Sequence, residues 1–231
     1  MHVIYRISEN GYLKEKPEYV NNENCLRSAL FVFAKAKWTI IADNVNEATK
    51  AAVEESYGDI KYVNVGHGAG TFNKALDIAL GLPEDETVYF LENDYLHRYN
   101  ADRVLESAFD LEFDYVTLYD HPDKYMNPFE GGNPFCSNRS EATRVYLGEY
   151  CHWKLTNSTT MTFAAKVKTI KQDISVLRKW TSGSHPHDFQ MFTELTQRGR
   201  RLASPLPGYA THGETKWLSP LTNWKETLWK N

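Results

Sequence analysis

Residues 88–95, Val-Tyr-Phe-Leu-Glu-Asn-Asp-Tyr, are the stretch that decides the fold class of this chain. Four consecutive apolar residues predict a short buried strand, and the polar residues that follow mark its end. Glu92 and Asp94 stand two positions apart just beyond that end. Two carboxylates so placed can approach one Mg²⁺ or Mn²⁺ ion, which usually shares its oxygen ligands with substrate phosphates. The competing interpretation is an acidic turn that caps a following helix.

Two further polar signals follow predicted strands upstream. Residues 38–42 are a short apolar run that ends at Asp43, which could bind a base or ribose or simply form a turn. Residues 60–65 run into the glycine-rich stretch 66–70, which leads into a helix start of the kind that favours anions. That stretch lacks a P-loop ending, and most glycine runs are tight turns. Lys74 is either a phosphate contact one turn into the helix or a solvated surface lysine.

Strand-like and helix-like segments alternate over roughly the first 120 residues, which is typical of a largely parallel sheet with crossover helices. We expect strands at residues 2–7, 38–42, 60–65, 88–91 and 115–118. We expect helices at residues 22–36, 46–57, 72–80 and 100–109, the third capped by Thr71. Because ligands gather at the carboxyl ends of strands in such sheets, the polar signals above should lie together.

The pattern changes after residue 120. Residues 121–140 hold three prolines and two adjacent glycines, which predicts a long loop able to close over a ligand. We then expect antiparallel strands at 145–150 and 152–164, helices at 166–179 and 187–198, and an irregular tail from Leu202. Four tryptophans could form a sugar-stacking platform, although buried packing is the commoner fate; they are Trp153, Trp180, Trp217 and Trp224.

Composition places the chain among ordinary globular proteins, with 42% hydrophobic and 24% charged residues in 231, which excludes disordered and fibrous classes. The net charge of -4 disfavours a protein that binds nucleic acid through many phosphate contacts. Cys25, Cys136 and Cys151 are odd in number, which indicates free thiols in a reducing compartment. The opening residues MHVIYRIS and the absence of a long apolar run predict no secretory signal and no membrane span, hence a cytoplasmic location.

Three segments, in order, resemble the GT-A glycosyltransferases, the family of nucleotide-diphospho-sugar transferases. They are IIADN (40–44), GHGAGTFNKALDIALG (66–81) and VYFLENDY (88–95), the last in the place of the family's D-x-D metal motif. The resemblance covers residues 1–120 and includes small viral and bacterial members. It implies an α/β, Rossmann-like GT-A fold: a mixed, mostly parallel sheet flanked by helices, with a smaller antiparallel acceptor-side region. We expect one domain, with a nucleotide-sugar-binding half at 1–120 and an acceptor-side half at 121–231.

The resemblance also implies roles for residues on the donor side. Asp43 would contact the nucleoside, with Arg6 near the base. Gly68 opens the stretch that leads to Asn73 and Lys74, and these two would lie near the ribose or the diphosphate.

A metal-binding set is implied as well. Asp94 would be the main direct ligand, while Glu92 stands where the family has Asp and could bind the metal, the ribose or water. His212 matches a late histidine that some members use as a further ligand, and an ordinary loop histidine is the alternative. Asp188, at the start of the helix expected over 187–198, would be the general base of an inverting enzyme. Helix capping alone also favours Asp there.

These inferences predict a hexosyl- or pentosyltransferase that uses a UDP- or GDP-sugar, needs Mn²⁺ or Mg²⁺, and glycosylates a hydroxyl of a glycan or glycoprotein. A non-catalytic nucleotide- or carbohydrate-binding module is one alternative. A sugar-1-phosphate nucleotidyltransferase is another, although residues 8–19, SENGYLKEKPEY, hold one glycine where that class has a glycine-rich loop. A DNA acceptor is disfavoured by net charge but kept open by basic residues; these are Lys166, Lys168, Lys171, Arg178, Lys179, Arg198, Arg200 and Arg201.

Overall fold

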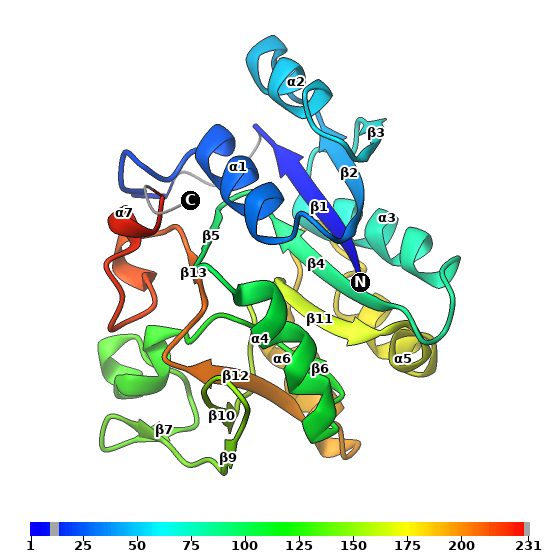
Figure 1. The fold of residues 1–231 in the computed structure, drawn as a ribbon. Helices are drawn as coiled ribbons and strands as arrows, with labels where there is room; N and C mark the ends of the chain where they lie inside the picture. Colours follow the sequence, from blue (N-terminus) through cyan, green and yellow to red (C-terminus); the bar gives the residue numbers. More distant parts are fainter. Residues whose placement is uncertain (10–13, 229–231) are drawn as a thin grey trace.

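The computed structural model describes residues 1–9 and 14–228, and within them nine strands form one mixed sheet (Figure 1). The strand order is β3-β2-β1-β4-β11-β6-β12-β10-β9. The first four strands in the chain are mutually parallel: β1 (His2–Ser8), β2 (Lys37–Asp43), β3 (Asp59–Val63) and β4 (Thr87–Glu92). The helices between them are α1 (Asn22–Val32), α2 (Glu47–Glu54) and α3 (Gly68–Leu80). The predicted alternation of strand and helix is confirmed here.

Chain segments after residue 110 continue the same sheet. The strands are β6 (Tyr115–Val116), β9 (Val145–Leu147), β10 (His152–Leu155), β11 (Phe163–Lys166) and β12 (Leu202–Leu206). β11 enters antiparallel between β4 and β6, and β12 joins β6 to β10. The expected antiparallel pair at 145–164 is therefore only partly right, since β9 pairs with β10 but β11 pairs elsewhere. One sheet spans both of the predicted halves.

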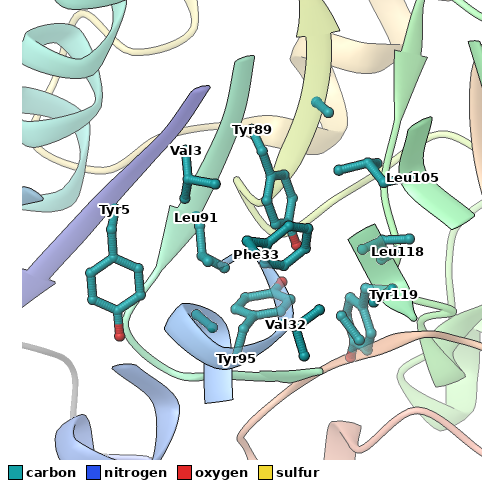
Figure 2. Packing of buried hydrophobic residues seen from close by; sticks show 14 of the residues in the cluster. Val3, Tyr5, Val32, Phe33, Tyr89, Leu91, Tyr95, Leu105, Leu118 and Tyr119 are labelled. Carbon is teal, nitrogen blue, oxygen red and sulfur yellow. The ribbon is translucent and has the colours of Figure 1, made fainter. Parts of the chain in front are cut away.

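Both faces of the sheet centre are buried, as expected for parallel strands covered by helices. On one face, Val3 and Tyr5 of β1 and Leu91 of β4 pack beneath α1 and α4 (Ala101–Ala108), as Figure 2 shows for the residues around Phe33. On the other face, Ile4 packs with residues of α3, α5 (Val167–Lys179) and α6 (Asp188–Gln197). This alternation follows from the period of two in a strand. Each large apolar side chain so buried contributes roughly 1.5–3 kcal/mol.

The tail predicted to be irregular contains two strands. β12 is one, and β13 (Ala210–His212) pairs antiparallel with β5 (Tyr95–His97) in a second small sheet. Pro205 within β12 disguised this strand, because proline is normally excluded from inner strands. β12 tolerates it because the pairing with β6 covers only Leu202 and Ala203, so Pro205 has a strand partner on the β10 side alone. A short helix, α7 (Trp224–Thr227), follows.

The long loop at 121–140 is anchored rather than free. It forms 3-10 turns at Pro122–Tyr125 and Pro128–Glu130 and a small hairpin of β7 (Cys136–Ser137) and β8 (Ser140–Glu141). Lys124 is fully buried and donates to Ser158 Oγ at 2.7 Å, and Asn133 donates to Asn157 Oδ1 at 2.9 Å. Removing a buried, paired charge is costly. The structure therefore does not support the expectation of a lid here.

Within the described residues, no helix combines the length and apolar character that crossing a membrane requires. Cys25, Cys136 and Cys151 are all free thiols, as predicted.

Candidate functional site

A cleft of about 330 Å³ lies at the carboxyl ends of β1, β2 and β4. That size suits a small-molecule site. Six residues singled out from the sequence line it: Arg6, Asp43, Gly68, Glu92, Asp94 and Asp188. The carboxyl ends of neighbouring parallel strands meet at one edge of a sheet, so the expectation that the polar signals lie together is met.

Asp43 fixes one wall of the cleft. Its Oδ1 accepts from the backbone N–H of Val65 at 2.7 Å, and its Oδ2 accepts from that of Gly66 at 2.9 Å. Gly66 has φ +79°, which favours glycine at the point where the chain turns from β3 towards α3. The buried carboxylate thus ties the end of β2 to this turn.

The glycine-rich stretch is mostly the first turn of α3 and not an open loop. The helix begins at Gly68, one turn before the expected start, and its cap is His67 rather than Thr71. His67 Nδ1 accepts from the backbone N–H of Gly70 at 3.0 Å. A Cβ on residue 70 would lie 2.7 Å from His67 Cε1 and 2.3 Å from Val65 Cγ1, so this position requires glycine.

Three backbone donors in the first turn of α3 are already paired. Besides the bond from Gly70 to His67, Ala69 N–H donates to Ser184 O at 3.3 Å, and Thr71 N–H donates to His67 O at 3.2 Å. These three N–H groups are therefore not available to a phosphate, and a phosphate contact by this stretch stays a prediction for its other donors.

Asn73 and Lys74 do not reach the cleft. The Asn73 side chain donates to Thr181 O at 2.8 Å and to Ala69 O at 3.0 Å, which ties α3 to the end of α5. Lys74 is exposed on the helix surface. The structure therefore does not bring these two residues to the other predicted donor contacts.

Arg6, which is buried, pairs with the half-buried Glu92 at the cleft floor. Arg6 Nη2 donates to Glu92 Oε1 at 3.0 Å and to Met161 O at 3.2 Å, and Nη1 donates to Gly68 O at 3.2 Å. The guanidinium also lies over the Phe72 ring, 5.2 Å from its centroid. Burial raises the pKa of Glu92 even though Arg6 opposes this shift. Arg6 thus joins β1, β4, α3 and the 161 turn, and these bonds leave Glu92 facing the arginine.

Asp94 and His212 meet because β5 and β13 pair. The register sets His212 opposite Tyr95, next to Asp94, and the imidazole Nε2 lies 3.2 Å from Asp94 Oδ2. Gly213 permits this approach, since a Cβ there would lie 2.9 Å from the backbone oxygen of Asp94 and 2.2 Å from Val20 Cγ1.

Two lysines approach the same carboxylate oxygen of Asp94. Lys16 Nζ lies 3.2 Å and Lys14 Nζ 3.7 Å from Oδ2, and Lys14 Nζ also lies 3.0 Å from His212 Nε2. Burial alone would raise the pKa of Asp94, but His212 and the two ammonium groups outweigh it and hold that pKa well below its usual value. The carboxylate is therefore ionised across the physiological pH range.

The residues present fit a divalent cation in part. Asp94 Oδ1 is buried and has no hydrogen-bond partner, and an imidazole nitrogen lies beside the same carboxylate. Oxygen and imidazole ligands suit Mn²⁺. Among the described residues, however, no group of three or more His, Cys, Asp or Glu side chains gathers to hold a metal. A cation here would have two protein ligands and would take the rest from water or a bound phosphate.

Asp188 is the first residue of α6, as predicted, and it braces an unusual turn. Its Oδ2 accepts from the backbone N–H of Thr159 at 2.7 Å and of Thr160 at 2.8 Å. Thr160 and Met161 both have positive φ, at 51° and 59°, a conformation that costs energy for residues with a side chain. The hydrogen bonds that Asp188 Oδ2 accepts stabilise this turn in the cleft wall. Asp188 Oδ1 takes no part in these two bonds.

Several cleft residues escaped the sequence analysis. His67 is an unusual helix cap, and the 160–161 turn carries no glycine to mark it. Lys14 and Lys16 could have been noted from the sequence, because they are two closely spaced basic residues shortly after the first strand. Their contact with Asp94 depends on long-range packing that the sequence does not show.

No match is found among protein-family models or curated proteins. Among solved structures, GalNAc-T7 with UDP, GalNAc and Mn²⁺ is similar at a TM-score of 0.58 and 12% identity, over 91% of this chain. The chain has a GT-A fold. It spans only 42% of the GalNAc-T7 chain. The predicted α/β class with a mixed sheet flanked by helices is confirmed.

Two other solved structures align with lower scores. The galactosyltransferase LgtC in complex with donor and acceptor sugar analogues matches at a TM-score of 0.44 and 12% identity, over 84% of this chain and 69% of its own. A197 from STIV matches at a TM-score of 0.46 and 15% identity, over 95% of this chain and 91% of its own.

Proposed function

We propose that this chain is a glycosyltransferase that takes a sugar from a nucleotide-diphosphate sugar. The observation that carries the proposal is the Asp94–His212 pair, 3.2 Å apart, beside a cleft at the strand ends of a GT-A fold. GalNAc-T7, which shares this fold, was solved with UDP and Mn²⁺. That precedent supports a UDP-sugar as the first donor to test, with a GDP-sugar as the second.

The donor would lie across the strand ends. We place the nucleoside at the Asp43 side, where the carboxylate holds the backbone of Val65 and Gly66 in one shape. The diphosphate would then point to Asp94 and His212. Arg6 and Glu92 form the floor between these two ends, so their role is to keep the strands and α3 in place.

Asp94 and His212 would hold Mn²⁺ or Mg²⁺, whose bound form supplies positive charge that stabilises a departing diphosphate. The chain's own contribution is to keep Asp94 ionised and His212 beside it. The partnerless Oδ1 of Asp94 is the atom that gains most from a cation, because a buried, unpaired carboxylate oxygen is costly.

Asp188 would act as the general base towards the acceptor hydroxyl. The two backbone N–H groups on Oδ2 fix the carboxylate against the cleft wall, so that the second oxygen can take the proton. A carboxylate held in this way loses little freedom when substrate binds. Direct attack with such a base favours inversion at the anomeric carbon.

The acceptor is best sought among glycans and glycoproteins. The basic residues that kept a DNA acceptor open are largely paired with acids, as Arg178 is with Asp77 at 2.6 Å and Lys179 with Glu194 at 2.7 Å. Lys171, Arg198 and Arg200 have acidic partners too. Paired charges offer little to a phosphate backbone, which argues against DNA.

The test is a panel of UDP- and GDP-sugars incubated with the protein in Mn²⁺, Mg²⁺ or EDTA, with donor hydrolysis and transfer to mixed glycans as readouts. We expect metal-dependent turnover of one nucleotide family. Pyrophosphate release from a nucleoside triphosphate and a sugar 1-phosphate would instead identify a nucleotidyltransferase. Saturable donor binding without any turnover would identify a binding module.

A further inference from the structure

The carboxylates of the cleft differ in what balances their charge. Asp43 and Asp188 accept backbone N–H bonds, and Glu92 is paired with Arg6. Glu9 accepts from the hydroxyl of Thr49. Among the described residues that line the cleft, Asp94 is the one carboxylate whose ion-pair partners are lysines.

The charges at Asp94 do not cancel. Two ammonium groups lie 3.2 Å and 3.7 Å from a single carboxylate oxygen, so this oxygen has one more cationic partner than its charge needs, although carboxylates outnumber cations in the cleft lining as a whole. The two like charges repel each other, and the repulsion is appreciable at this range outside bulk water. A pair that served only to neutralise Asp94 would need one lysine. The second lysine at Asp94 is therefore a cation with which an anion entering the cleft can pair.

Both lysines come from a backbone that is fixed in place. The carbonyl of Glu15, between them, accepts from the N–H of Thr215 at 2.8 Å and from its hydroxyl at 3.0 Å. This joins the lysine segment to the chain just after His212. The side chains themselves are partly exposed, 27% for Lys14 and 33% for Lys16. A fixed backbone with flexible four-carbon stems lets the ammonium groups turn from one partner to another.

We propose that Lys14 and Lys16 bind the diphosphate of the donor, and that they leave Asp94 when it arrives. This proposal rests on the proposed function, and it assigns the two lysines as the contacts of the diphosphate leaving group. A diphosphate oxygen accepts strong, charge-assisted bonds from ammonium groups. A divalent cation on Asp94 would repel the lysines and drive the same exchange. The lysines thus give the diphosphate an affinity for the protein that does not depend on metal.

The experiment is calorimetric titration of UDP, GDP and inorganic pyrophosphate into the full chain, first in EDTA and then in Mn²⁺. The variant is Lys14→Ala/Lys16→Ala, and the matched control is Lys37→Ala, an exposed lysine that pairs with Glu86 away from the cleft. In EDTA we expect the double variant to bind the diphosphate at least about tenfold more weakly, since bonds to charged groups are strong. The control should match the wild type, and Lys14→Arg/Lys16→Arg should restore most of the binding and show that the segment still folds.

Equal or tighter diphosphate binding by the alanine variant would overturn the proposal, because the lysines would then only occupy the place of a cation. If the wild type binds no diphosphate under any condition, the proposed function fails and this proposal fails with it. If the wild type binds and both lysine variants bind equally well, only this proposal fails.

Discussion

Two walls of the cleft hold their carboxylates in different ways. Asp43 and Asp188 are fixed by pairs of backbone N–H groups, at 2.7 to 2.9 Å. Asp94 is balanced by the buried side chain of His212 and by two partly exposed lysines, and the lysines can move away. Backbone partners cannot leave without unfolding the turns they belong to. The difference indicates that Asp43 and Asp188 keep fixed positions in the cleft wall, while Asp94 is where the proposed exchange of partners for a ligand takes place.

The largest expected effect is at Asp188. In Asp188→Asn the amide oxygen can still accept from Thr159 and Thr160, so the turn keeps its shape. The group can no longer take a proton, and we expect the rate of transfer to fall about 10²–10⁴-fold. Donor binding should not change. A transfer rate close to that of the wild type would reduce Asp188 to a helix-start residue that only braces the turn.

Asp94→Asn tests the exchangeable side of the comparison. We expect donor turnover to fall about 10²–10³-fold, since a group that stabilises the leaving charge is weakened. The free energy of unfolding should fall less than in Asp43→Asn, because the two lysines can turn to solvent while backbone donors cannot. Kinetic assay and urea unfolding check the two parts. The control is Asp77→Asn, which removes an exposed partner of Arg178 and should leave turnover intact.

Asp43→Asn tests the fixed side. Asparagine has one acceptor oxygen, so it cannot accept from both Val65 and Gly66 as the carboxylate does. We expect a loss of about 2–3 kcal/mol in the free energy of unfolding, larger than that of Asp94→Asn. Equal losses in the two variants, measured by urea unfolding at pH 7, would remove the distinction between fixed and exchangeable carboxylates.

A buried histidine away from the cleft gives an effect that depends on pH and not on the ligand. Burial lowers the pKa of His97 to about 3, while the unfolded chain has about 6.5. The folded state therefore keeps this ring neutral, and its stability is complete above pH 6.5 and falls as the pH drops towards 3. The slope from this group approaches at most about 1.4 kcal/mol per pH unit.

Urea unfolding between pH 7 and pH 4.5 measures that slope. In His97→Phe the slope of the unfolding free energy against pH should become smaller, because one proton fewer is taken up on unfolding. In His152→Gln, which changes an exposed histidine, the slope should stay the same. An unchanged slope in His97→Phe would mean that other groups account for the acid sensitivity.

Much of the fold could be predicted from local sequence patterns. The apolar run at 88–91 ends at Glu92 in the structure as in the sequence, and the helix expected from residue 46 begins at Glu47 with Asn46 as its cap. Elements defined by distant partners were harder. β13 is three residues long and exists because β5 pairs with it, and β12 contains Pro205. Neither has a periodic pattern long enough to be recognised.

The residues of the candidate site also divide into those that local sequence patterns predicted and those that depend on distant contacts. Asp43, Glu92 and Asp94 follow strands, so the rule of the strand ends placed them correctly in the cleft. The first turn of α3 was harder to interpret, because the N–H groups of Ala69, Gly70 and Thr71 donate to Ser184 and His67, which no local pattern shows. The lysine contacts depend on the backbone of Glu15 meeting Thr215, two hundred positions away.

The central claim is that Asp94 and His212 together hold a cation beside a bound diphosphate. The most direct measurement is pulsed electron paramagnetic resonance of Mn²⁺ added to the protein with UDP or GDP. We expect a nitrogen coupling to the bound ion in the wild type that disappears in His212→Ala, together with a phosphorus coupling from the nucleotide. Bound Mn²⁺ that shows no nitrogen coupling in the wild type, or keeps it in His212→Ala, would contradict the account.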